Sequence, residues 1–183
     1  MNLNEDLGIA ALAVALVKHP RGTYQEIASS IGVSRATLYR FCSSRDELVL
    51  RVLRHATAKL NDSLVEAHLG EGYNEDAVKR LINSYLSNKE LVCFISQYWD
   101  AETEGDPELA AAWEVHQRQI DDFFLCGQKA GHFRMDISAE ALNEALCWLI
   151  VGLVDGERRG RVARAKLSST IESLFLDGML LKD

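Results

Sequence analysis

The segment from Ser34 to Phe41 carries side chains suited to contacting double-stranded DNA. An arginine can donate two hydrogen bonds to a guanine edge, a threonine methyl can contact thymine, and tyrosine or a second arginine can reach phosphate. At helical spacing, Leu38 faces inward and the other side chains share an outer surface. The predicted DNA-reading set is Arg35, Ala36, Thr37, Tyr39 and Arg40.

Two short helical patterns must position these side chains, and they meet at a tight turn containing Gly32. Thr23 and Glu26 have the spacing of a capping box at the start of the first helix. Gly32 follows its end, where φ often turns positive, and Ser34 can cap the second helix. This order predicts a helix-turn-helix, whose second helix enters the major groove. A helical hairpin without DNA contacts shares the spacing, but its outer face would mix Glu and Lys.

The stretch from about Leu7 to Leu53 resembles the DNA-binding domain of TetR-family transcriptional regulators. The matching identities run in order across three helices and comprise Ile27-Ala28, Gly32-Val33-Ser34, Thr37-Leu38-Tyr39 and Ser44-Arg45-Asp46-Glu47-Leu48. The sequence departs from the family pattern at Phe41 and Cys42, where the family usually has His and then Phe. Three further residues are expected to touch the DNA backbone, namely Thr23, Tyr24 and Arg45. For Arg45, the alternative is a solvated surface side chain.

The distribution of charge agrees with a DNA-binding N-terminal part. The whole chain carries a net charge of −7. Residues 1–60 contain eight Lys or Arg and five Asp or Glu, whereas residues 61–183 contain twelve and twenty-two. A basic head on an acidic body attracts phosphate at one end only. We therefore expect residues 1–46 to bind DNA and residues 47–183 to form a ligand-binding and dimerisation domain.

Hydrophobic periodicity, frequent Ala and Leu, and only two prolines favour an all-α chain. The sequence predicts three helices in the head and six in the body, about nine in all. The expected ranges are 7–17, 23–31, 34–41, 44–68, 74–86, 88–103, 107–129, 138–154 and 162–180. Ser44 with Glu47 has the spacing of a second capping box, at the start of the fourth helix. This layout matches that of the TetR family.

Aromatic and polar side chains recur in the sixth and seventh predicted helices. Most such residues belong to ordinary hydrophobic cores. The TetR resemblance implies instead that some line an effector pocket among helices four to seven, suited to a moderately hydrophobic organic molecule. The candidate pocket residues are Phe94, Tyr98, Trp99, Trp113, His116, Gln117 and Phe123.

The last two predicted helices share a long apolar face, which either covers the chain's own core or joins two chains. The resemblance implies that it forms a four-helix homodimer interface. The candidate interface residues are Leu142, Leu146, Leu149, Leu153, Leu167, Ile171, Leu174 and Phe175.

The sequence lacks the motifs that would indicate an enzyme or a metal-binding protein. The sequence has no metal-ligand spacing of His or Cys, no phosphate loop and no nucleophile elbow, so we expect neither catalytic residues nor a metal or cofactor. It also has no apolar stretch of membrane-spanning length and no signal peptide at its start, which favours the cytoplasm. We expect a dimeric transcriptional regulator, specifically a repressor, that a small organic effector releases from a palindromic operator. The alternative is a helical ligand-binding or interaction module that has lost operator binding.

Overall fold

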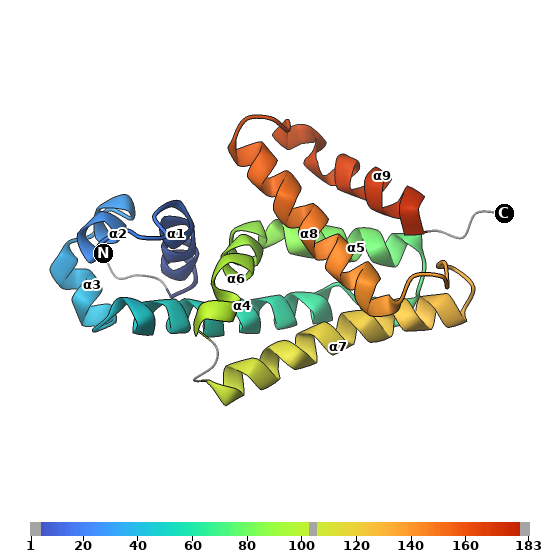
Figure 1. The fold of residues 1–183 in the computed structure, drawn as a ribbon, viewed down its shortest axis with the longest axis horizontal. Coiled ribbons are helices and arrows are strands. Elements are labelled where there is room, and N and C mark those ends of the chain that lie inside the picture. The colour runs from blue at the N-terminus through green and yellow to red at the C-terminus, as the bar shows by residue number, and fades with distance from the viewer. Residues whose placement is uncertain (1–4, 103–105, 180–183) are drawn as a thin grey trace. The chain divides into compact units, whose positions relative to one another are not determined.

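The computed structural model describes residues 5–102 and 106–179, and these residues form helices without any strand. The described segments contain nine α-helices and two short 3-10 helices (Figure 1). The α-helices are α1 (Glu5–Lys18), α2 (Tyr24–Ser30), α3 (Arg35–Phe41), α4 (Arg45–Glu66), α5 (Glu75–Ser87), α6 (Lys89–Glu102), α7 (Pro107–Lys129), α8 (Ala139–Arg158) and α9 (Leu167–Met179). The 3-10 helices are η1 (Leu69–Glu71) and η2 (Arg164–Lys166). The all-α prediction is confirmed.

The chain divides into two compact units. The first unit combines Met1–Lys59 with Glu90–Ala112, and the second combines Leu60–Lys89 with Trp113–Asp183. Helices α4 and α7 each contribute residues to both units. The boundary expected after residue 46 separates a DNA-binding segment from a ligand-binding and dimerisation segment. This division of function stays a prediction.

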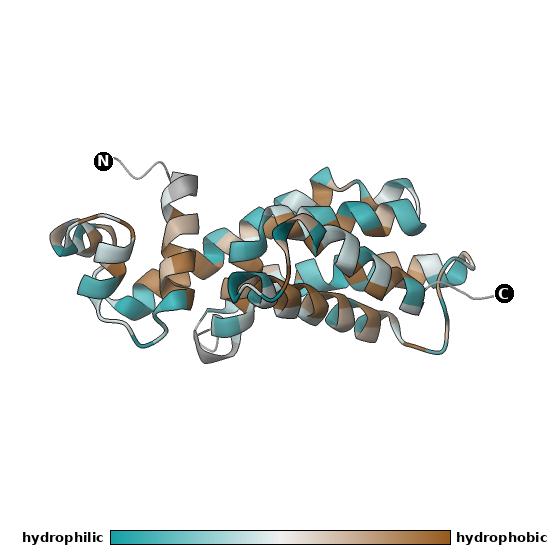
Figure 2. Ribbon diagram, turned by 90° about the horizontal axis from the view of Figure 1, so that it is seen from above, coloured by the Kyte–Doolittle hydropathy of each residue, from teal (hydrophilic) through white to brown (hydrophobic). Residues whose placement is uncertain are grey.

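Local sequence determines where the helices of the first unit begin. The Thr23 and Glu26 capping box closes on both sides, with Thr23 N–H donating to the Glu26 carboxylate at 2.6 Å. Helix α1 contacts α2, and α2 contacts α3. Their apolar faces are buried together, and Figure 2 shows hydrophobic colouring over the middle of α1. Leu12, Ile27 and Leu38 are fully buried, so a small core fixes the direction of α3.

Aromatic side chains form the centre of the second unit. The ring of Phe124 on α7 lies 5.9 Å from the rings of both Phe133 and Phe175, measured between centroids. Gly127 gives Phe133 the space it occupies, because a Cβ at residue 127 would lie 2.1 Å from the Phe133 ring. Helix α8 packs on α9, and α5 contacts both.

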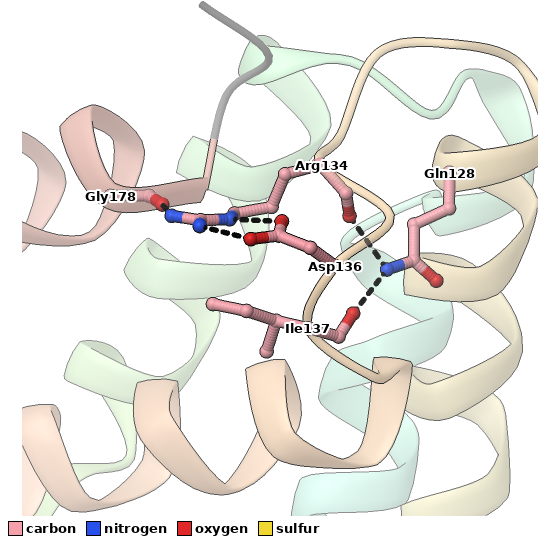
Figure 3. Close-up of polar contacts among 5 residues, drawn as sticks. All are labelled: Gln128, Arg134, Asp136, Ile137 and Gly178. Carbon is pink, nitrogen blue, oxygen red and sulfur yellow. Dashed lines mark hydrogen bonds and ion pairs between the residues drawn. The ribbon is translucent and has the colours of Figure 1, made fainter.

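Polar contacts fix the connector between α7 and α8 (Figure 3). The Gln128 side-chain amide donates to the carbonyls of Arg134 and Ile137, at 2.8 and 2.7 Å. The Arg134 guanidinium forms a bidentate pair with Asp136 and donates to the Gly178 carbonyl at 2.8 Å. Since Gly178 lies in the last turn of α9, Arg134 supplies one of the donors that a helix C-terminus lacks. The connector thereby ties α7 to α9.

Several predicted boundaries need correction. Helix α8 continues to Arg158, four residues beyond the predicted end, and α9 begins at Leu167 rather than Val162 because η2 occupies the preceding turn. Ser44 does cap the N–H of Glu47, at 3.1 Å, but the Glu47 carboxylate accepts its short hydrogen bonds from the backbone and hydroxyl of Ser43, at 2.8 and 2.5 Å. The predicted ends at residues 103 and 180 lie outside the described residues.

Within the described segments, none of the helices combines the length and apolarity needed to cross a lipid bilayer. The same segments contain no group of three or more His, Cys, Asp or Glu side chains arranged to hold a metal ion.

Candidate nucleic-acid interface

Helix α3 is short and is held at both ends. At its start the Ser34 hydroxyl accepts from the backbone N–H of Thr37 at 3.0 Å. At its end the Cys42 N–H donates to the Leu38 carbonyl at 3.0 Å. Gly32, in the turn before it, has φ +72°, a left-handed conformation that glycine adopts at little cost. The predicted turn and cap of the helix-turn-helix are confirmed.

The outer face of α3 carries four of the five predicted DNA-reading residues in exposed positions. These are Arg35, Ala36, Tyr39 and Arg40, while Thr37 is half-buried. The Arg35 guanidinium donates to the Tyr39 hydroxyl at 3.2 Å and lies 5.1 Å from the centre of its ring. Tyr39 in turn stacks on Tyr24, with ring centroids 4.5 Å apart. Arg35 is therefore held in place before any ligand arrives, which reduces the entropy lost on binding.

Tyr24 faces the interior, unlike the exposed Thr23 beside it. Its hydroxyl lies 2.8 Å from the Cys42 carbonyl and 3.0 Å from that of Ser44. Burial raises the pKa of Tyr24 to about 12, so the hydroxyl keeps its proton and can donate to these carbonyls. Tyr24 thus links α2 to the turn between α3 and α4.

Arg45 also points into the first unit and is half-buried. Its Nη2 donates to the Pro20 carbonyl at 2.6 Å and to the Tyr98 hydroxyl at 3.0 Å. Tyr98, on α6, donates its own proton to the Leu16 carbonyl at 2.9 Å. That carbonyl would normally pair with the N–H four residues later, but residue 20 is a proline and has none. One pair of side chains therefore joins α1, α4 and α6.

The two positions that depart from the family pattern have defined roles. Cys42 is buried in the core, with 2% of its surface exposed. Phe41 is covered by Arg51, whose guanidinium carbon lies 3.9 Å from the ring centre and which donates to the Phe41 carbonyl at 3.1 Å. Residue spacing could not indicate this contact, because the two residues lie on different helices. Phe41 is half-buried and Cys42 is buried, so neither side chain belongs to the exposed face of α3.

The predicted effector-pocket residues are divided between the two units. In the first unit, Phe94 is fully buried and stacks on Tyr98 with ring centroids 4.8 Å apart, and Trp99 is half-buried. In the second unit, Trp113 and Gln117 are half-buried. Phe123, also in the second unit, lines a cavity of about 350 Å³, whose other walls the sequence did not indicate.

His116 belongs to a closed hydrogen-bond network in the second unit. Its Nδ1 lies 3.1 Å from the Asn61 amide oxygen, and its Nε2 lies 3.0 Å from the Tyr85 hydroxyl. An amide oxygen only accepts, so Nδ1 carries the proton and Nε2 accepts from Tyr85. Burial lowers the pKa of His116 to about 4, which keeps the ring neutral at physiological pH. Both ring nitrogens are therefore satisfied without a ligand.

The predicted interface residues of α8 and α9 differ in exposure. Five pack into the chain's own core and offer no surface to a partner: Leu142, Leu146, Leu167, Ile171 and Phe175. Leu149 and Leu153 are half-buried, and Leu174 is 57% exposed. Trp148, absent from the predicted set, is 58% exposed on α8. Trp148 and Leu174 are thus the large apolar side chains that the described parts of α8 and α9 expose to solvent.

Comparisons with known proteins agree with this geometry. No family model matches the chain. The HTH-type transcriptional regulator NfxB of Pseudomonas aeruginosa is 40% identical over 175 residues, covering 93% of this chain and 91% of NfxB. The HTH-type transcriptional repressor LfrR of Mycolicibacterium smegmatis is 29% identical over 110 residues, or 60% of this chain and 57% of LfrR.

A solved structure shares the whole fold. The crystal structure of the TetR-like regulator LfrR from Mycobacterium smegmatis in complex with proflavine superposes with a TM-score of 0.71, over 95% of this chain and 94% of that one, at 21% identity. The helix-turn-helix and the helical body thus define a DNA-binding transcription regulator. The chain belongs to the TetR family of transcriptional regulators. Proteins of this family regulate transcription and are not enzymes.

Proposed function

We propose that this protein is a homodimeric repressor that acts in the cytoplasm, binds a palindromic operator and is released from it by a small organic effector. The observation that carries the proposal is the exposed face of α3, where Tyr39 holds Arg35 at 3.2 Å. An arginine held in this way can bind the O6 and N7 atoms of guanine in the major groove. Repression is supported by the similarity to the repressor LfrR.

The proposed DNA contacts follow from exposure. Arg35 reads a guanine edge, Thr37 contacts a thymine methyl, and the small side chain of Ala36 allows the helix to approach the bases. Tyr39 and Arg40 bind phosphate, together with the exposed hydroxyl of Thr23. Tyr24 and Arg45 act differently in this proposal. Their polar atoms are engaged inside the first unit, so they position the helices that contact DNA.

Dimerisation brings two copies of α3 to the operator. The proposed interface is the outer face of α8 and α9, formed by Trp148, Leu149, Leu153 and Leu174. Trp148 and Leu174 leave more than half of their surface exposed in the single chain, which a two-fold partner would cover. Dimeric helix-turn-helix proteins place their reading helices about 34 Å apart, one turn of DNA.

An effector acts in this mechanism by favouring a conformation in which the two reading helices are wrongly spaced. It can shift that balance only as far as its affinity differs between the two conformations. The contacts of Arg45 and Tyr98 support transmission of a conformational change to the N-terminal helices. Tyr98 of α6 bonds to both α1 and α4, so a movement of α6 would displace these two helices together. LfrR binds the planar dye proflavine, which makes proflavine a suitable first probe for an effector of this chain.

A gel-shift titration with the DNA flanking the protein's own gene tests the proposal. The expected result is a specific complex at low salt that random DNA of equal length does not compete away at equal concentration. Sedimentation of the same sample should report a dimer at micromolar concentration. A pure dimer that shifts neither DNA at low salt would overturn operator binding and leave a helical ligand-binding or interaction module.

A further inference from the structure

The cavity of the second unit lies beside the C-terminal turn of α4. Leu64 and Val65 of that turn form one wall, Tyr73 follows η1, and Phe123 and Asp122 come from α7. Its volume of about 350 Å³ falls within the range of small-molecule sites. Val65 is 72% exposed, so an apolar side chain faces solvent at the cavity. A ligand that covered Val65 would remove this apolar surface from water.

Two aromatic rings make this cavity suited to a flat molecule. The centroids of Tyr73 and Phe123 lie 6.0 Å apart, and the ring planes are tilted by 46°. Phe123 is 2% exposed and therefore fixed, whereas Tyr73 is half-buried. Aromatic rings of this kind bind other ring systems through offset or edge contacts. They also attract cations placed over their faces.

The wall formed by the end of α4 is held rigidly. His68 adopts a left-handed backbone conformation, with φ 50° and ψ 47°, which is uncommon for a residue other than glycine. Arg80 of α5 keeps this turn in place by donating to the Ala67 carbonyl at 2.8 Å and to the His68 carbonyl at 3.2 Å. A site fixed in advance loses less entropy when it binds a ligand.

The charge of the lining distinguishes between classes of ligand. Asp122 contributes a carboxylate, and no Lys or Arg lines the cavity within the described part of the chain. The His68 ring, which also borders the cavity, lies 3.1 Å from the Glu71 carboxylate. An anionic ligand such as a fatty acid would approach these carboxylates without a cationic partner. A cation would gain the attraction of Asp122 and of the aromatic rings.

From these observations we infer that the cavity is the effector site and takes a planar aromatic cation, with Tyr73 and Phe123 against its ring system and Asp122 as its counterion. Gln119, also in the lining, is available to accept from an amino group of such a ligand. The inference rests on the proposed function, since it names the effector of the regulator. It also gives α4 a direct part in the response, because one turn of this helix forms a wall of the site.

Fluorescence titration with proflavine tests the site in the full-length protein. Asp122→Asn removes the charge of an exposed side chain with little change in shape, so the variant should fold. It should weaken proflavine binding about fivefold, the magnitude of a partly screened ion pair. Asp177→Asn on α9 makes the same change away from the cavity and should bind like the wild type. Tyr73→Leu should also weaken binding, because it removes one ring.

Three outcomes would overturn the inference. They are no saturable binding of proflavine by the wild type, equal affinity of the wild type and Asp122→Asn, or displacement of proflavine by a long-chain fatty acid. A gel shift on the same samples without proflavine separates this test from that of the proposed function. A wild type that shifts operator DNA but binds no cation refutes the effector site alone. A wild type that binds the cation through Asp122 but shifts no DNA refutes the repressor alone.

Discussion

The substitution Tyr98→Phe isolates the contacts through which α6 reaches the N-terminal helices. It removes one hydroxyl and keeps the ring, so stacking on Phe94 is preserved. Two hydrogen bonds are lost, the one that Tyr98 donates to the Leu16 carbonyl at 2.9 Å and the one that it accepts from Arg45 at 3.0 Å. Pro20 has no N–H to replace the first bond, so the carbonyl is left without its helical donor.

The cost follows from burial. Tyr98 is 6% exposed, and a buried carbonyl without a partner costs about 1–3 kcal/mol. Arg45 is half-buried and keeps its bond to Pro20, so the loss of its contact with Tyr98 adds little. We expect Tyr98→Phe to lower the free energy of unfolding by about 2 kcal/mol.

Urea unfolding of the wild type and two variants measures this loss. All samples need the same protein concentration, because stability would depend on it if the chain dimerises as proposed. Tyr39→Phe is the matched control, since it removes an exposed tyrosine hydroxyl that accepts a hydrogen bond from Arg35. It should change stability by less than about 0.5 kcal/mol. If Tyr98→Phe were as stable as Tyr39→Phe, the hydroxyl would not join α6 to α1 and α4, and the proposed route for the effector signal would lose its support.

Two further predictions concern the body of the protein. The pKa of His116 is about 4 in the folded chain, against an ordinary value of 6.5. Between these two pH values the unfolded chain binds more protons than the folded chain. The free energy of unfolding therefore decreases as the pH falls from 6.5 to 4, by about 3 kcal/mol in total. Urea unfolding at pH 7 and pH 4.5 should show this loss in the wild type and a smaller one in His116→Gln; equal losses would contradict it. Trp148→Glu and Leu174→Glu should each sediment as monomers, because each buries a charge twice at the two-fold interface. Val115→Glu, at an exposed apolar residue of α7, should remain dimeric, and a monomeric wild type would contradict the interface.

Helices and their caps were largely predictable because their signals are local. Thr23 and Ser34 each accept from a backbone N–H in the first turn of the helix that the sequence predicts they cap. The apolar side chain of Leu38 faces the core at the expected helical phase. The late start of α9 was missed, because the 3-10 turn before it has no distinct sequence pattern.

Contacts between distant residues were not predictable from spacing. Arg45 and Tyr98 are 53 positions apart, and nothing in either helix indicates that they meet. Periodicity identifies an apolar face but does not say what covers it. The apolar pattern therefore predicts Ile171 as an interface residue although the chain's own core buries it, and it does not select the exposed Trp148. The cavity beside the end of α4 depends on the packing of α7 and was also missed, apart from Phe123.

The proposed function depends on base reading by Arg35 of α3. Fluorescence anisotropy with the DNA flanking the protein's own gene, and with random DNA of the same length, measures this reading. Arg35→Ala should weaken binding to the specific DNA by about 1–3 kcal/mol and change binding to random DNA much less. Arg118→Ala, which removes the same charge from an exposed position on α7, should leave both affinities unchanged. Equal losses on the two DNAs for Arg35→Ala would contradict base reading by this residue.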